Sequence, residues 1–202
     1  MDGGRGVGLD RSRVTELHYI THRANLASIV RLGILSHRRV TSLPHRSIAD
    51  EEVQDRRRNK RVPNGLLIHE YANAYFDARN PMMYKRLDQR RELAVISIMP
   101  GILDLPGTVI SDGNAASDGT LFSASPEGLT MLDEQRVYAE WWTDGDGMEK
   151  WERKRQRCAE VLVPDRIAPE YIRGCYVFNS EALPACRAAG LKAAVNKRVF
   201  FD

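Results

Sequence analysis

The sequence predicts a single α+β domain with a mixed, mainly antiparallel central sheet flanked by helices. At 202 residues, the chain is long enough for one domain with a sizeable apolar core. Short runs of apolar and β-branched residues, clearest at residues 93–98 and 158–163, indicate buried strands. Apolar residues spaced three and four apart, as in residues 21–35, indicate helices between these strands.

The N-terminal half is expected to contain two helices, each with a sequence signal at one end. Gly33 lies near the end of the first, where a glycine is common. Ser47 is a good N-cap for the second, which continues through a run of arginines to the turn at residues 63–65. The expected elements are a strand at residues 17–20, helices at residues 21–35 and 47–62, and extended segments at residues 66–69 and 74–76.

The C-terminal half is richer in strand patterns. Its most regular strand ends at Pro100 and Gly101, and another ends in the turn at residues 112–114. Residues 144–147 are expected to form a flexible loop. It leads to a basic, loop-like stretch at residues 151–157 and then to the strand containing Glu160. The expected strands are residues 93–98, 108–110, 158–163, 174–178 and 198–201, with one or two helices in residues 126–142 and another at residues 180–189.

Composition places the chain among ordinary globular proteins. Residues 1–13 are rich in glycine and arginine without an apolar centre, so we expect a flexible tail there and one domain over residues 14–202. No apolar run is long enough to span a membrane. The three cysteines form no C-x-x-C pair, which favours a reducing cytoplasm.

The histidines do not form a metal-binding set. His69-Glu70 resembles the start of a zinc protease motif, but Asn73 stands where the second histidine would be needed. His18 and His22 are four apart across a predicted strand end, where that spacing does not place them on one face. The sequence therefore predicts no metal cofactor.

Positive charge is concentrated in two segments, although the formal net charge is only +3. These are residues 56–61 and 153–157. Either cluster alone would be interpreted as a solvated surface. Because the two flank the segments that carry the candidate chemistry, together they favour phosphate binding.

Glu160 is the most informative single residue. It lies within the apolar run at residues 158–163. Burying an ionised carboxylate without a partner costs free energy on the order of several kcal/mol. The residue types leave two interpretations open: a catalytic acid in a cleft, or a structural acid paired with an arginine. The basic segment before it contains Trp151 and could bind an anion or a nucleobase.

Four segments, taken in chain order, resemble the DarT family of bacterial toxins, which ADP-ribosylate single-stranded DNA with NAD. They are Tyr19-Ile20-Thr21-His22 with Asn25-Leu26, residues 48–57, residues 75–84 and residues 158–163. The chain departs from the family pattern at Cys158, usually glutamine, at residues 78–81, usually Pro-Arg-Ser-Pro, and at Tyr19, often histidine. The resemblance implies an ADP-ribosyltransferase-like fold, NAD as substrate and a macrodomain antitoxin (DarG-like) as partner. It leaves thymidine and guanosine open as the modified base.

The resemblance also implies roles for particular residues. Glu160 would stabilise the oxocarbenium-like state formed when the nicotinamide–ribose bond breaks, and could accept a proton from the attacking base. Arg57 would hold the NAD pyrophosphate or the base, because a guanidinium suits bidentate acceptors. The remaining NAD-binding candidates are Tyr19, Thr21, His22, Asn25, Tyr75, Arg79 and Met82, and the DNA-binding candidates are Trp151, Lys154 and Arg155.

Two alternative functions remain open. One retains the NAD chemistry but transfers ADP-ribose to protein or RNA. The other is a basic nucleic-acid-binding module without catalysis, which would bind DNA in a salt-sensitive way but release no nicotinamide. The segment at residues 75–84 argues against the second, because a simple binding module has no need of it.

Overall fold

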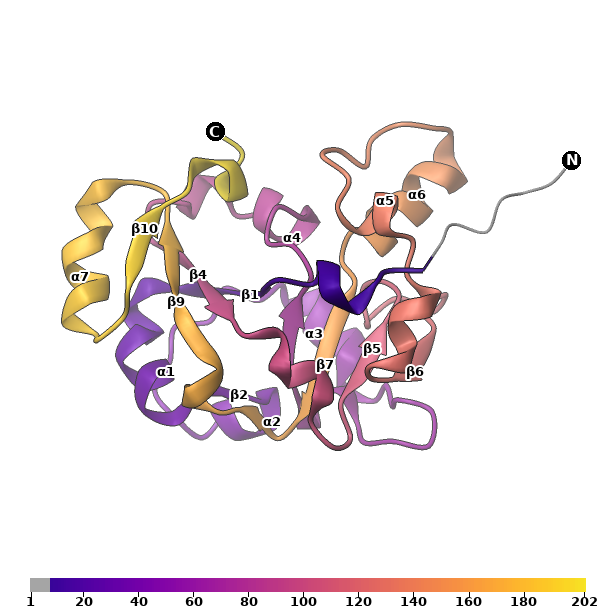
Figure 1. Cartoon of the computed structure of the whole chain (residues 1–202), viewed down its shortest axis with the longest axis horizontal. Coiled ribbons are helices and arrows are strands. Elements are labelled where there is room, and N and C mark those ends of the chain that lie inside the picture. Colours follow the sequence, from indigo (N-terminus) through magenta and orange to yellow (C-terminus); the bar gives the residue numbers. More distant parts are fainter. Residues whose placement is uncertain (1–7) are drawn as a thin grey trace, which may run out of the picture.

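The computed structural model describes residues 8–202, which form one eight-stranded sheet flanked by helices (Figure 1). The strands are β1 (Leu17–His22), β2 (Ile34–Leu35), β3 (Tyr71–Tyr75), β4 (Leu93–Ile98), β5 (Val109–Ser111), β6 (Phe122–Ala124), β7 (Glu160–Pro164), β8 (Arg166–Ile167), β9 (Ile172–Val177) and β10 (Ala193–Val195). The helices are α1 (Leu26–Leu32), α2 (His37–Val40), α3 (Glu51–Arg58), α4 (Pro81–Tyr84), α5 (Glu134–Val137), α6 (Gly147–Gln156) and α7 (Leu183–Ala188).

The sheet is mixed but mainly antiparallel, as the sequence predicts. Its order is β10-β9-β4-β1-β3-β7-β5-β6, and β10 with β9 is its parallel pair. β2 and β8 form a separate antiparallel pair. In Figure 1, α7 lies beside β10 at one edge of the sheet, while α5 and α6 lie near β5 and β6 at the other.

β4 shows how the sheet is buried on both faces. All of its residues are buried, and successive side chains point to opposite faces. Ala94, Ile96 and Ile98 belong to the larger apolar core, and Leu93 and Val95 to a second, smaller one. The expected strand at residues 93–98 is therefore confirmed, and its apolar run, interrupted by Ser97 alone, reflects burial on two sides.

Several element boundaries differ from the sequence-based expectations. The second helix begins after Asp50, whose carboxylate accepts the Val53 N–H at 3.3 Å, and not after Ser47. Residues 66–69 were expected to be extended, but they include the start of a 3-10 turn, Ile68–Glu70. Residues 198–201 were expected to form a strand, but they lie largely in the 3-10 turn Lys197–Phe200. The basic, loop-like stretch expected at residues 151–157 is replaced over most of its length by α6, which begins at Gly147.

α6 forms because local polar interactions compensate for its lack of an apolar stripe. The Asp146 carboxylate accepts the Glu149 N–H at 3.2 Å and caps the helix. Glu149 pairs with Arg153 four residues on at 2.6 Å, and Glu152 pairs with Arg155 three residues on at 2.5 Å. Such pairs stabilise a helix by about 0.2–0.5 kcal/mol each.

A flexible N-terminal tail is expected over residues 1–13, of which residues 1–7 lie outside the described residues. From Gly8 onward the chain is packed, which corrects that part of the expectation. Gly8 forms an isolated bridge with Asp133, and the buried Leu9 donates its N–H to the Leu129 carbonyl at 3.0 Å. Within residues 8–202, no helix combines the length and apolarity needed to cross a membrane.

Candidate active site

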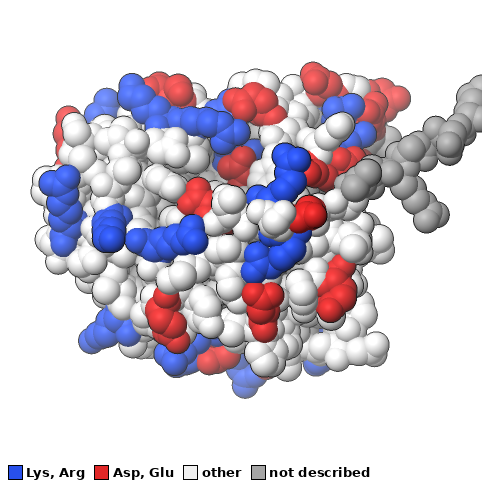
Figure 2. All heavy atoms as spheres, viewed as in Figure 1, with Lys and Arg blue, Asp and Glu red and all other residues white. Residues whose placement is uncertain are grey.

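A cavity of about 580 Å³ lies between α1, α3, β3, α4 and α6. This volume is in the range of small-molecule and cofactor sites. Eight arginines and lysines line the cavity, whereas Asp50 is the one acid among the described residues that do so. The face shown in Figure 2, by contrast, intersperses cations with acids. The cavity is therefore suited to an anionic ligand of nucleotide size.

Arg57 and Glu160 form a bidentate ion pair at the cavity wall. Arg57 Nη1 donates to Glu160 Oε1 at 3.2 Å, and Nη2 donates to Oε2 at 3.0 Å. Arg57 lines the cavity and is the buried residue of α3, whereas Glu160 lies behind it and is 1% exposed. The structure therefore shows the arginine pairing of the structural interpretation, and the arginine partner is itself part of the cavity wall.

Electrostatic attraction and hydrogen bonds hold the two groups of this pair together. Burial opposes the charge on Arg57, but the adjacent Glu160 carboxylate outweighs it and raises the pKa of Arg57. Glu160 Oε1 also accepts the backbone N–H of Ala115 at 2.9 Å. The carboxylate thus receives three donors, and about four lone-pair positions are available on a carboxylate.

Sheet register places Tyr75 directly beside the acid. Tyr75 of β3 is paired with Glu160 of β7, so both side chains leave the sheet on the same face. Burial, followed by the charge of Glu160, raises the pKa of Tyr75 well above its usual value. The same two causes raise the pKa of Cys158 to about 12. Two neutral side chains therefore line the cavity next to the carboxylate.

Three of the other expected NAD-binding residues line the cavity near the end of β1. Tyr19, Thr21 and Asn25 all contribute to its wall. Asn25 Nδ2 donates to Thr21 Oγ1 at 3.1 Å and to the Arg46 carbonyl at 2.9 Å, while Asn25 Oδ1 accepts the Arg46 N–H at 2.9 Å. Asn25 thus ties the segment before α3 to β1. Met82 of α4 also lines the cavity.

His22 and Arg79, by contrast, are engaged elsewhere. His22 Nε2 lies 3.0 Å from Glu92 Oε2, and its Nδ1 accepts the Ala24 N–H at 3.0 Å. Arg79 Nε pairs with Glu140 at 2.9 Å, and its guanidinium carbon lies 4.2 Å from the centre of the Phe201 ring. Neither residue contributes to the cavity wall.

The expected DNA-binding residues divide in the same way. Trp151 and Lys154 border the cavity, and Trp151 is 50% exposed. Arg155 also borders it but is only 5% exposed, and its guanidinium is bonded to Asp112 and Glu152. The structure therefore exposes Trp151 and Lys154 at the cavity edge, whereas the guanidinium of Arg155 is engaged by two acids.

Two histidines of the cavity wall were not identified from the sequence. The His37 and His69 rings lie with their centres 4.1 Å apart and are inclined by 33°. Burial, followed by the nearby His37 and Arg57, lowers the pKa of His69 to about 4, and burial also lowers the pKa of His37. The two residues are far apart in the sequence and carry no shared motif, so only the fold reveals the pair.

Comparisons with known proteins identify the family. The model of the DarT family, described as ssDNA thymidine ADP-ribosyltransferase, matches residues 18–199. The chain is 34% identical over 192 residues to a Thermosipho africanus (strain H17ap60334) protein named DNA ADP-ribosyl transferase-DNA ADP-ribosyl glycohydrolase fusion protein, covering 92% of this chain and 47% of that one. It is 30% identical over 161 residues to the DNA ADP-ribosyl transferase of Thermus sp. (strain 2.9), covering 74% of each.

A solved structure supports the fold assignment. Thermus sp. 2.9 DarT in complex with ADP-ribosylated ssDNA is similar with a TM-score of 0.80 and 24% identity, over 97% of this chain and 99% of that one. The fold is therefore that of an ADP-ribosyltransferase. The chain belongs to the DarT family. It spans about half the length of the Thermosipho fusion protein.

Proposed function

We propose that this chain is a toxin that transfers ADP-ribose from NAD to thymidine in single-stranded DNA. The family model supports thymidine over guanosine as the acceptor, since its description specifies thymidine. The observation that carries the proposal is the Arg57–Glu160 pair, held at the wall of a cavity lined mainly by cations. Such a cavity accommodates the pyrophosphate of a dinucleotide and brings the acid close to its ribose.

The reaction needs one bond broken and one formed at the same carbon. The nicotinamide leaves with the bonding electron pair of the C1′–N bond, which leaves positive charge on the ribose. Glu160 supplies negative charge where that charge develops. A nitrogen of the base then bonds to C1′, and the carboxylate accepts the proton that the base loses. Arg57 neutralises phosphate or orients the base.

The surroundings of Glu160 suit this role. The Ala115 N–H fixes one carboxylate oxygen, and the neutral Tyr75 and Cys158 add no competing charge. Tyr75 and Met82 offer apolar surface for a ring. At the cavity edge, Trp151 and Lys154 offer stacking and a cation for a single strand, whose bases are accessible without unpairing.

The direct test uses NAD labelled in its ADP-ribose part and single-stranded oligonucleotides that contain thymidine, guanosine or neither. We expect a labelled adduct on the thymidine oligonucleotide with the wild-type chain and at least a hundred-fold slower reaction with Glu160→Gln. Glu181→Gln is the matched control, because Glu181 is exposed and pairs with Arg91 at the surface. A wild-type chain that gives no adduct, or a Glu160→Gln variant that reacts normally, would refute the proposal.

The alternatives are separated in the same assay. Adding RNA and a protein mixture as competing acceptors tests for other targets, and nicotinamide release tests for catalysis. Labelled RNA or protein without labelled DNA would favour the first alternative. Salt-sensitive DNA binding without nicotinamide release would favour the non-catalytic module.

We also propose a macrodomain antitoxin as the partner and the cytoplasm as the site of action. The Thermosipho relative, by its name, joins a DNA ADP-ribosyl transferase to a DNA ADP-ribosyl glycohydrolase. A second activity that removes ADP-ribose from DNA would counteract the proposed toxin. Expression of the chain alone is expected to stop growth, and co-expression of a DNA ADP-ribosyl glycohydrolase to restore it. Growth unaffected by the chain alone would contradict the toxin assignment.

A further inference from the structure

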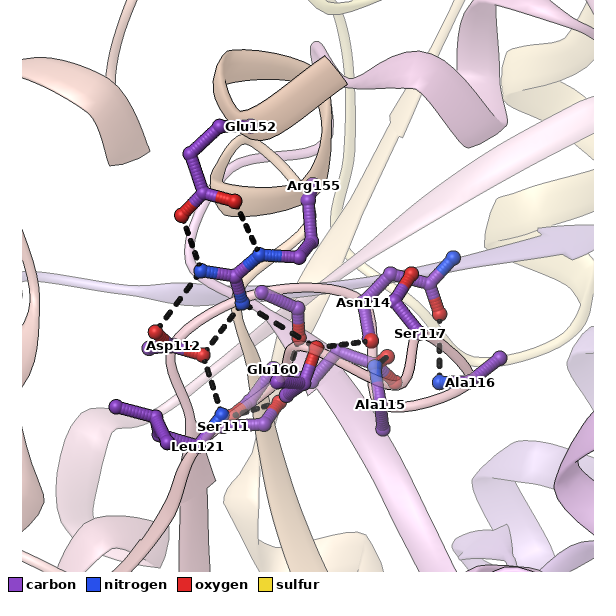
Figure 3. A network of polar contacts seen from close by, with 12 residues as sticks. Ser111, Asp112, Asn114, Ala115, Ala116, Ser117, Leu121, Glu152, Arg155 and Glu160 are labelled. Carbon is purple, nitrogen blue, oxygen red and sulfur yellow. Dashed lines mark hydrogen bonds and ion pairs between the residues drawn. The ribbon is translucent and has the colours of Figure 1, made fainter. Parts of the chain in front are cut away.

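A buried ion-pair network lies beside the proposed catalytic acid (Figure 3). Arg155 of α6 makes a bidentate pair with Asp112, with Nη1–Oδ1 at 2.6 Å and Nη2–Oδ2 at 3.0 Å. Its Nε and Nη2 also donate to Glu152 at 2.8 and 2.5 Å, and Nη1 donates to Thr120 Oγ1 at 3.3 Å. A guanidinium has five N–H donors, and these bonds use all five. Arg155 therefore retains no donor for DNA.

The network fixes both ends of the loop over residues 112–121. The Asn114 N–H donates to the Arg155 carbonyl at 3.0 Å, and the Leu121 N–H donates to Asp112 Oδ1 at 2.8 Å. At Gly113, a Cβ would lie 2.5 Å from Arg155 Nη1 and 2.8 Å from its carbonyl oxygen. Only glycine permits this approach, so the loop is fitted closely around Arg155.

The same loop carries the third donor to the catalytic acid. Ala115, one residue beyond Asn114, donates its N–H to Glu160 Oε1 at 2.9 Å. Asn114 caps the turn by accepting the Ala116 N–H at 2.9 Å and also lines the cavity. The position of the Ala115 amide, and with it one oxygen of Glu160, is thus determined by where Arg155 holds the loop.

We propose that Arg155 and Asp112 are positioning residues that orient Glu160 through the Ala115 amide. This inference deepens the proposed function and rests on it for the catalytic role of Glu160. Loss of the pair would release the loop, and Glu160 would then be oriented by Arg57 alone. The sequence suggested a different role, in which Arg155 contacts DNA, and the two roles predict different defects.

The first test is spectroscopic and requires neither NAD nor DNA. An amide that donates to a carboxylate has a distinctive NMR resonance, which for Ala115 is identified by its loss in Glu160→Gln. We expect Asp112→Asn and Arg155→Gln to shift this resonance, while Arg153→Gln leaves it in place. Arg153 is the matched control because it lies on the same helix and pairs with Glu149 at the surface. An unchanged Ala115 resonance in both test variants would overturn the proposal.

The second test is kinetic. A positioning role predicts that Arg155→Gln and Asp112→Asn lower kcat about ten-fold or more with KM for DNA changed less than three-fold, and that Arg155→Lys recovers part of kcat. If Arg155 instead contacts DNA, its loss should raise KM for DNA and leave kcat unchanged. The dependence of DNA binding on salt concentration should then correspond to about one phosphate contact fewer. That result would overturn the proposal. Asp112→Asn, which keeps the side-chain shape, provides the second variant if Arg155→Gln does not fold. If the wild-type chain modifies no DNA, the proposed function fails, while the NMR result still decides the positioning of the amide.

A second, independent observation concerns an aromatic cluster outside the cavity. Tyr84, Trp141, Trp142 and Phe201 lie with ring centres 5.3–6.4 Å apart. Tyr84 is 50% and Trp141 46% exposed. The cluster continues directly from the cavity, because Met82 and Lys85 on either side of Tyr84 in the chain line it.

Charge around this cluster suits a nucleic acid strand. The guanidinium carbon of Arg79 lies 5.0 Å from the centre of the Trp141 ring, and Arg198 presents a half-exposed side chain nearby. Both arginines also pair with Glu140, at 2.9 and 3.3 Å, and so neutralise the acid of this surface. Exposed rings with adjacent cations are how single strands are held without base pairing.

From this we infer that Tyr84 and Trp141 stack on bases of single-stranded DNA that flank the modified nucleotide. Trp141→Ala is expected to weaken binding of a long oligonucleotide about 5- to 100-fold and that of a very short one less than two-fold, by fluorescence anisotropy. Leu66→Ala, at another exposed apolar position, is the control. If Trp141→Ala binds the long and the short oligonucleotide as tightly as the wild type does, the stacking role is refuted. Modification of DNA by the wild-type chain would still support the proposed function in that case. Loss of antitoxin binding alone would also refute the stacking role, and would assign the surface to a protein partner.

Discussion

Replacing both members of the Arg57–Glu160 pair by apolar residues tests whether the pair is kept for stability or for chemistry. The two groups are almost fully buried, so solvent screens them little. With charge centres about 4 Å apart and an effective dielectric constant of about 20, their attraction is about 4 kcal/mol. Desolvating both charges costs a similar amount, and the net contribution of such a pair is therefore small.

Removing one partner has a very different expected effect. Arg57→Met leaves Glu160 buried without its cation, which should lower the free energy of unfolding by about 3–5 kcal/mol. For a chain of 202 residues this corresponds to a fall in Tm of roughly 6–20 °C, at about 2–4 °C per kcal/mol. The double variant Arg57→Met/Glu160→Leu removes both charges and should regain most of that loss. Its recovery is limited by the Ala115 N–H, which loses its acceptor at a cost of about 1–3 kcal/mol.

The measurement is urea or thermal unfolding of the wild type, both single variants and the double variant, followed by circular dichroism. ADP-ribosyl transfer is measured on the same samples, and all three variants should be inactive. A stable but inactive double variant would indicate that the ion pair is retained for its chemistry. A double variant as unstable as Arg57→Met would refute the reasoning, because the pair would then contribute net stability.

Three further predictions follow from the described contacts. Asp77→Ala should lower the free energy of unfolding by about 3–5 kcal/mol, because it leaves the buried Arg157 guanidinium without the carboxylate 2.8 Å away; a loss below 1 kcal/mol in thermal unfolding would contradict this. The pKa of His69 is lowered from 6.5 to about 4, so the unfolded chain binds a proton at His69 more readily than the folded chain does. The free energy of unfolding should therefore be highest, as far as His69 is concerned, above pH 6.5 and should decline as the pH falls toward 4. His69→Asn should flatten that decline in melts recorded between pH 7 and pH 4, and an identical slope would exclude His69 as its source. Trp151→Ala should weaken DNA modification but preserve slow NAD hydrolysis, and equal loss of both activities would remove Trp151 from the DNA site.

The sequence predicts those parts of the fold in which burial leaves a simple pattern. The strand at residues 93–98 is found as predicted, because a strand buried on both faces is a nearly continuous apolar run. α6 was missed because its residues form no apolar stripe and its stability comes from the Asp146 cap and from ion pairs. Such interactions depend on side-chain partners and leave no apolar periodicity to detect.

The candidate site shows the same division at the level of single residues. The family resemblance singles out Arg57 and Glu160 separately, and only the fold shows that these residues, 103 positions apart, form an ion pair. The sequence does not show that His22 is engaged by Glu92, 70 positions away, or Arg155 by Asp112, 43 positions away. A cation is visible in a sequence, but the acid that neutralises it is brought to it only by the fold.

The pairing of Glu160 with a cation would remove it from any chemistry if that cation belonged to the closed interior. Arg57, however, belongs to the cavity wall, and its charge is available to the anionic pyrophosphate of a dinucleotide. In the proposed reaction, the arginine would engage phosphate, and the carboxylate behind it would then carry an unopposed negative charge next to the ribose, where positive charge develops as nicotinamide departs. The Arg57–Glu160 ion pair is then weakest when the transition state of the proposed reaction needs the acid most, which is the differential binding that accelerates a reaction.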